Sequence, residues 1–176
     1  PPRPPEMREE PPVRCTGQGG RQVRTSPEYG HIFDHHAVAY EYANGVRMFS
    51  FCRQQDGCAN DVDDYILGTK GRATVLKHTI VGETKWRYSG KDNNMYQTEH
   101  DELFASIRAG KPINNGLYMS RSTLLAIMGR MCTYTGKELT WDECFNSQER
   151  LGPAEYAWND NVPQVKVAIP GKTKLA

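Results

Sequence analysis

Two runs of alternating residues meet at Asn44-Gly45, and this hairpin signal constrains the fold more than any other feature. In "AVAYEYANGVRMFSFCRQ" the alternation predicts two strands, and Asn-Gly favours a two-residue turn because both turn positions need a positive φ angle. Such a turn sets Tyr40 opposite Phe49. The large side chains then share one face: Val38, Tyr40, Tyr42, Phe49 and Phe51. We expect this face to cover a core or to meet another subunit.

More strands are predicted after the hairpin. The segment "DDYILGTKGRATVLKHTI" predicts a second strand pair that turns between Gly68 and Gly71, and "TKWRYSG" predicts a further strand. The first half of the chain therefore reads as a series of antiparallel strands.

The second half changes to a helical period. "TEHDELFASIRAGKP" predicts a helix with Thr98 and Asp101 at its N-terminus and a stop at Gly110. Its apolar face would hold Tyr96, His100, Leu103, Phe104 and Ile107, which makes His100 a core or interface histidine. A second helix would begin at Ser120 or Ser122 and end at Gly136.

A third, short helix is predicted by a capping box that Thr140 forms with Glu143. Strands followed by helices indicate an α+β fold, an open and mostly antiparallel sheet with helices on one face, in two layers. Residues 1–12 hold six prolines and read as an arm or linker, and residues 13–176 read as one domain. The closing segment "NVPQVKVAIPGKTKLA" is predicted to be extended.

Composition excludes several functional classes. Basic and acidic residues number 22 and 21, so the chain has no excess of positive charge that would attract nucleic acid. No apolar run is long enough to cross a bilayer. The chain begins with Pro1, which leaves a cytoplasmic or an exported location open. The five cysteines lack a C-x-x-C pair and are expected to be mainly reduced thiols, with a Cys52–Cys58 bridge as the alternative.

The glycine cluster in "CTGQGGRQVR" does not match a dinucleotide-binding loop. The fingerprint needs a third glycine where this chain has Gln22, and no helical pattern follows. The glycines still allow close approach of a ligand or a neighbouring strand, and the fork of Arg21 suits carboxylates, phosphates and sugar hydroxyls. A bulged strand with solvated arginines is the alternative.

The densest polar group lies in "EYGHIFDHHAV". We interpret it as a loop that lines a pocket where a strand begins. Surface histidines are one alternative, and a metal site of a lyase or hydrolase is another. The metal reading is disfavoured because His35 and His36 would point to opposite faces of a strand. The members of the group are Tyr29, His31, Asp34, His35 and His36.

Several strings, in this order, resemble one protein family. They are "VRCTGQGGRQVRT", "EYGHIFDHHAVAYEYANGVRMFSFCRQ", "ILGTKGRA", "EHDELFASIRAGKPINNG", "YTGKELTWDE" and "VAIPGKTKLA". From Val13 to its end the chain resembles the C-terminal domain of the Gfo/Idh/MocA (glucose–fructose oxidoreductase / inositol dehydrogenase) family, planctomycete-type. The resemblance implies an open antiparallel sheet that forms one wall of a sugar site, while the other sheet face makes a homo-oligomer.

Members of that family transfer a hydride between NAD(P) and sugars or polyols. The Rossmann domain, the Glu-Lys-Pro motif and the Asp-x-x-x-His pattern of the family do not occur here. We therefore expect a fragment or truncated product that binds no cofactor itself and is inactive alone, with NAD or NADP implied for a full-length protein.

The expected function is the substrate-binding and oligomerisation domain of such an oxidoreductase, and a stand-alone carbohydrate-binding or assembly module is the alternative. No catalytic residue is assigned. The residues predicted to contact a polyol are Arg21, Gln22, Tyr29, His31, Asp34 and His35.

Overall fold

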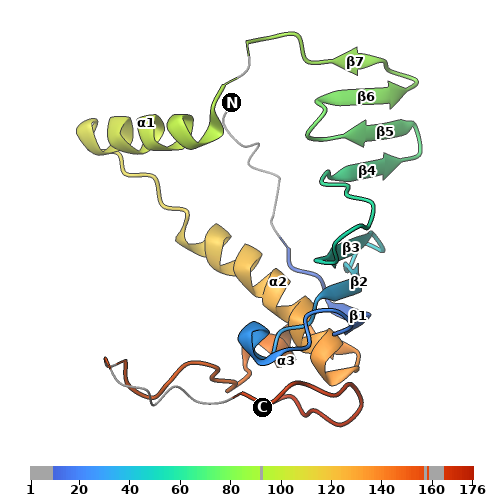
Figure 1. The fold of residues 1–176 in the computed structure, drawn as a ribbon. Helices are drawn as coiled ribbons and strands as arrows, with labels where there is room; N and C mark the ends of the chain where they lie inside the picture. Colours follow the sequence, from blue (N-terminus) through green and yellow to red (C-terminus); the bar gives the residue numbers. More distant parts are fainter. Residues whose placement is uncertain (1–9, 92, 157, 159–164) are drawn as a thin grey trace. The chain divides into compact units, whose positions relative to one another are not determined.

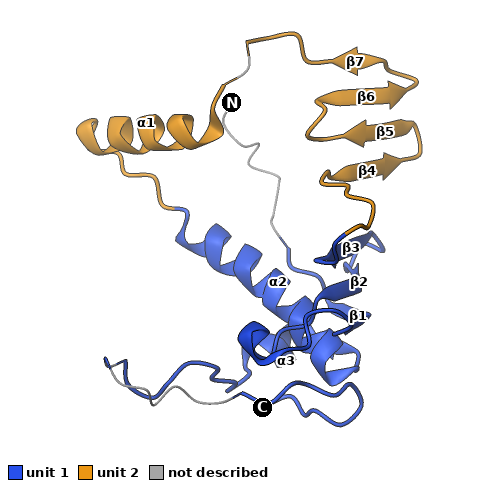
Figure 2. Cartoon of the chain, in the orientation of Figure 1, with its two compact units in different colours: residues 1–56, 115–176 blue, residues 57–114 orange. Residues whose placement is uncertain are grey.

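The computed structural model describes residues 10–91, 93–156, 158 and 165–176 (Figure 1). Two compact units divide the chain: a core unit of residues 1–56 and 115–176, and an insert unit of residues 57–114 (Figure 2). Each unit carries its own four-stranded antiparallel sheet. The predicted α+β class is confirmed, and the strands form two sheets where the sequence indicated one.

The sheet of the core unit has the strand order β3-β2-β1-β8. Helix α2 (Gly116–Thr135) packs against β1 and β2 and covers one face of the sheet (Figure 1). The structure describes no helix or strand of this unit on the other face, which we call the open face. The strands are β1 (Arg14–Gly20), β2 (His35–Glu41), β3 (Arg47–Arg53) and β8 (Leu139–Thr140).

The β2–β3 hairpin exists as predicted, but its predicted register is wrong by one residue. Tyr40 lies opposite Met48 instead of Phe49, and the loop holds three residues because Tyr42 N donates to Val46 O at 2.9 Å. Gly45 alone takes a positive φ, 81°, as in a type I turn closed by a glycine bulge.

The shift moves the side chains of β3 to the other face. Val38 and Tyr40 remain buried under α2, whereas Phe49 and Phe51 lie on the open face. The predicted gathering of all five large side chains on one face is therefore also wrong.

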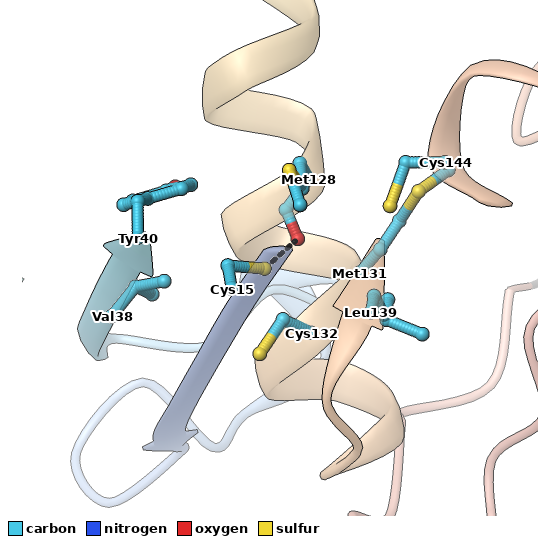
Figure 3. Packing of buried hydrophobic residues seen from close by; sticks show 8 residues of the cluster. All are labelled: Cys15, Val38, Tyr40, Met128, Met131, Cys132, Leu139 and Cys144. Atoms are coloured by element: carbon cyan, nitrogen blue, oxygen red, sulfur yellow. Dashed lines mark hydrogen bonds between the residues drawn. The ribbon is translucent and has the colours of Figure 1, made fainter. Parts of the chain in front are cut away.

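The core lies between α2 and the covered face of the sheet (Figure 3). Cys15 Sγ donates to Met128 O at 3.8 Å, and Tyr40 Oη donates to Leu125 O at 3.0 Å. A Cβ on Gly129 would lie 2.3 Å from Tyr40 Oη, so this glycine lets the ring reach the helix. The core residues are Cys15, Val38, Tyr40, Met128, Met131, Cys132, Leu139 and Cys144.

All five cysteines are free thiols, so the Cys52–Cys58 bridge is not formed. Cys52 and Cys58 are exposed, while the other three are buried. Burial raises the pKa of the Cys144 thiol to about 11, which keeps it protonated near neutral pH.

Local signals predicted the end of α2 and the start of α3, but not the start of α2. Helix α2 is stopped by Gly136, in the left-handed region at φ 68°, as predicted, but it begins at Gly116, before Ser120. Helix α3 (Trp141–Phe145) has the predicted capping box, in which Thr140 Oγ1 accepts from Glu143 N at 3.2 Å.

The predicted extended C-terminal segment is only partly described. Residues 159–164 lie outside the described residues, and residues 165–176 contain a turn and no strand. Thr173 N donates to Ile169 O, and Gly171 N donates to Thr135 O at 2.8 Å. This turn therefore contacts the end of α2. The proline-rich arm lies outside the described residues up to position 9.

The insert unit holds the second sheet, in the order β4-β5-β6-β7. Gly68 pairs with Gly71, which confirms the predicted turn, and the predicted strand near Trp86 is also present. The strands are β4 (Tyr65–Gly68), β5 (Gly71–Thr74), β6 (Thr79–Gly82) and β7 (Trp86–Arg87).

Helix α1 (Met95–Arg108) also belongs to the insert unit and begins three residues before the predicted Thr98. Asn94 caps it by accepting from Tyr96 N at 3.0 Å and from Gln97 N at 3.3 Å. His100, predicted to be a core or interface histidine, is exposed and its Nδ1 lies 2.6 Å from Tyr96 O. Among the described residues, neither this helix nor another is long and apolar enough to cross a membrane.

Candidate functional site

Asp34 organises a polar cluster where β1 ends and β2 begins. Its side chain is buried, with 2% of the residue exposed. Its Oδ2 accepts three consecutive backbone N–H groups, from Gln22 and Val23 at 2.7 Å and from Arg24 at 3.0 Å. The carboxylate therefore folds the segment after β1 around itself.

These contacts keep the Asp34 carboxyl charged. Burial by itself raises its pKa, but the backbone N–H groups of residues 22–24 and the imidazole of His35 outweigh burial. The pKa of Asp34 is consequently held well below its usual range. A buried and fully ionised carboxylate is thus fixed at the centre of the cluster.

His35 is the half-buried partner of this carboxylate. Its Nδ1 lies 2.7 Å from Asp34 Oδ1, and 39% of its side chain is exposed. Because the ionised carboxylate accepts a hydrogen bond from Nδ1–H, Nε2 is the ring atom that can accept a hydrogen bond from a ligand. The pair has the orientation that a general base or a hydroxyl-binding histidine needs.

Two glutamine amides border the same pair. Gln55 Nε2 lies 3.4 Å from Asp34 Oδ1 and 3.5 Å from Gln22 Oε1. Gln55 was not predicted from the sequence. Its position follows from the hairpin, since the chain just beyond the end of β3 returns beside the start of β2, and this signal could have indicated it.

Arg21 shapes the loop that follows β1. Its Nε contacts Arg24 O, its Nη1 donates to Gly30 O at 2.7 Å and its Nη2 donates to Ser26 O at 3.0 Å. Three carbonyl groups of the loop are thereby satisfied by one guanidinium. In this structure Arg21 holds the loop closed.

Tyr29 and His31 lie on the same loop. Tyr29 ends the short 3-10 helix η1 (Pro27–Tyr29), and its exposed ring lies 5.6 Å from the guanidinium carbon of Arg24. His31 follows the turn at Gly30 and is half-buried. The structure thus links Gln22, Asp34 and His35 directly by hydrogen bonds and places Tyr29 beside them through Arg24.

His36 points to the covered face of the sheet, away from His35, as strand alternation predicted. Its Nδ1 lies 2.9 Å from Thr133 Oγ1. Its ring stacks on the Tyr134 ring, with the two ring centroids 6.1 Å apart. Burial, aided by the charges of His35 and Arg130, lowers the pKa of His36. Within the described residues no three His, Cys, Asp or Glu side chains are placed to hold a metal ion.

The glycines before the loop do not form a cradle for a dinucleotide. They belong to β1, where a Cβ on Gly17 would lie 2.6 Å from Ala37 O and one on Gly19 would lie 2.8 Å from His35 O. Close pairing with β2 explains both residues. The irregular residues 21–26 follow the strand, so these glycines do not open a helix whose N-terminus could hold a phosphate.

Comparisons with known proteins gave no match: no family model, no curated protein and no solved structure is detectably similar to this chain.

Proposed function

We propose that the core unit is the substrate-binding and oligomerisation domain of an NAD(P)-dependent oxidoreductase of sugars or polyols. The cofactor-binding domain would lie outside these 176 residues. The observation that carries the proposal is the Asp34–His35 pair, held by three backbone N–H groups and bordered by the amides of Gln22 and Gln55.

The chemistry of the cluster suits a polyol. A hydroxyl group donates and accepts hydrogen bonds at once, and amide and imidazole side chains offer both functions. The buried carboxylate fixes the imidazole and the loop before a ligand arrives, which lowers the entropy lost on binding. Tyr29 adds an exposed aromatic ring on which the C–H face of a sugar can pack.

In a dehydrogenase the chain's own residues would bind and orient the substrate. His35 Nε2 and the Gln22 amide would hold hydroxyl groups, so that the reacting carbon faces the cofactor. When bound by the other domain, NAD or NADP would accept or supply the hydride. The glycine cluster of β1 does not fit a dinucleotide, because its glycines pair closely with β2.

The open sheet face supports the oligomerisation part of the proposal. Phe49 and Phe51 stand beside Ala37 and Ala39 over a shallow hollow of about 360 Å³. Phe51 is 75% exposed. A second copy of this chain seated on this face would remove both rings from water.

The polar cluster borders this apolar face. Strand alternation sets His35 on the same face as Ala37 and Ala39, because residues two apart share a face. A neighbouring subunit on the open face would therefore lie close to the proposed substrate site.

Calorimetric titration of the chain with myo-inositol, glucose and glucitol tests the proposal. We expect at least one polyol to bind, and His35→Ala and Gln22→Ala each to weaken it about tenfold, the effect of losing a well-formed hydrogen bond to a ligand. His100→Ala and Gln97→Ala are matched controls on the exposed α1 and should change nothing. The proposal fails if no polyol binds or if the controls weaken binding equally.

NAD(H) titration separates the dehydrogenase from a stand-alone module. The full gene product should bind NAD(H), and these 176 residues alone should not. If no product of the gene binds NAD(H) while polyols still bind here, the chain is a carbohydrate-binding module instead.

A further inference from the structure

A basic hollow of about 1090 Å³ lies in the insert unit. One wall is the turn between β5 and β6, and the other is β7 with the segment that follows it. Its charged and polar lining includes Lys77, His78, Arg87, Ser89, Lys91 and Asn93.

Three basic residues line this hollow, and the structure describes no acidic residue among its lining. Position 92, between Lys91 and Asn93, lies outside the described residues. Lys77, Arg87 and Lys91 form no ion pair with the residues that the structure describes. By contrast, Lys70 of the same unit lies 3.7 Å from Glu83. Like charges that share one hollow repel each other, and an anion removes that repulsion.

Hydrogen bonds between its walls fix the shape of the hollow. His78 lies in the left-handed region at φ 49°, and its N–H donates to Val75 O at 2.9 Å. Tyr88 N donates to His78 O at 3.0 Å. The His78 and Tyr88 rings pack edge to face, with their centroids 5.8 Å apart. Tyr88 Oη also donates to Lys91 O at 3.3 Å. The backbone that carries the three cations is thus held in place without a ligand.

We propose that the basic hollow binds a small molecule that carries a phosphate group. Lys and Arg are the usual phosphate ligands, and Ser89 and Asn93 add neutral donors for the same oxygens. The volume exceeds what a single phosphate fills and lies slightly above the usual range of about 300–1,000 Å³ for sites of small organic ligands. Its residues are separate from the polyol cluster, so this proposal stands independently of the proposed function.

Calorimetric titration of the chain with inorganic phosphate, pyrophosphate and glucose 6-phosphate tests the proposal. We expect pyrophosphate and glucose 6-phosphate to bind more tightly than phosphate, with affinity falling as salt rises. Lys77→Gln, Arg87→Gln and Lys91→Gln should each weaken binding about tenfold, as expected when one charge-assisted contact is lost.

Two matched variants outside the hollow serve as controls. Lys70→Gln and Arg72→Gln remove the same charge from the same sheet and should leave affinity within about twofold, the size of a distant charge effect. Far-UV circular dichroism checks that each variant folds, and Arg87→Lys should recover part of the affinity. The proposal is overturned if no phosphate compound binds, or if all five charge removals weaken binding equally.

Discussion

The core unit and the insert unit bury their apolar side chains to very different extents. Met128 of the core unit is 0% exposed, whereas Leu67 of the insert unit is 80% exposed. Every described residue that is buried belongs to the core unit, and the described part of the insert unit contains none. The comparison shows that one unit is held by packing, and the other by strand pairing and turns.

Element length and sequence explain the difference. Strands β1 to β3 have seven residues each, and β1 and β2 pack against a twenty-residue helix, so side chains of the sheet and the helix interlock. Strands β4 to β6 have four residues each. A short sheet that no described helix of its unit covers gains little from burial, so we expect the insert unit to open locally at low free energy.

The largest predicted difference comes from truncating one apolar side chain in each unit. Met128→Ala should lower the free energy of unfolding by about 3 kcal/mol, because it leaves a cavity under the sheet. Leu67→Ala should change it by less than about 0.5 kcal/mol, as is usual for exposed positions. Urea unfolding measured by circular dichroism gives both values. Equal losses would contradict the contrast between the units.

The substitution Asp34→Asn tests whether the Asp34 carboxylate stabilises the loop after β1. We expect a loss of about 2 kcal/mol at pH 7, because the three N–H groups lose a charged acceptor. The folded-state pKa of Asp34 is depressed, so its contribution is present above the unfolded pKa, near 3.9, and is lost as pH falls toward the folded value.

Urea unfolding at several pH values checks this sign. The difference between the wild type and Asp34→Asn should shrink below about pH 4, where the unfolded carboxyl starts to bind a proton. A difference that grows on acidification would show that the Asp34 carboxylate does not stabilise the loop.

The exposed apolar residues of the two units should differ in self-association. Phe51→Glu places a charge on the open sheet face and should weaken a dimer at least tenfold, about 1.4 kcal/mol. Leu67→Glu makes the same change in the insert unit and should leave the dimer intact. Sedimentation velocity over a concentration series measures this. If Leu67→Glu abolishes the dimer and Phe51→Glu does not, the dimer contact lies in the insert unit and not on the open sheet face.

The smallest effect concerns the two helix caps. Thr140→Ala should lower the free energy of unfolding by about 1 kcal/mol, because the capping box of α3 is lost. Asn94→Ala removes the cap of α1 and should leave global unfolding unchanged while α1 amides exchange faster. Hydrogen exchange read residue by residue separates the two. A global loss with Asn94→Ala would mean that α1 unfolds together with the core unit.

Signals that act over a few residues predicted the fold well. The Thr140–Glu143 capping box, the stop at Gly136 and the Gly68–Gly71 turn are all confirmed, because each depends on neighbouring residues only. The register at Asn44-Gly45 was wrong because two-residue and three-residue hairpin loops share this dipeptide.

The candidate site was predictable only as a polar segment. The polar residues at positions 29–36 indicated where the site lies along the chain. They did not indicate that Asp34 is buried or that its carboxylate accepts hydrogen bonds from the backbone N–H groups of residues 22–24. Those contacts depend on the path of the loop after β1, which Arg21 closes through three carbonyl groups. Gln55 lies in the cluster because the pairing of β2 with β3 brings it beside Asp34.

The most direct test of the account is a map of where a polyol binds. Myo-inositol would be titrated into the ¹⁵N-labelled chain while backbone amide shifts are followed. We predict that the shifts are largest at residues 22–24 and 34–36 and near Gln55, with the insert unit unaffected. Shifts confined to the insert unit, or no saturable shift at all, would contradict a polyol site at the Asp34–His35 pair.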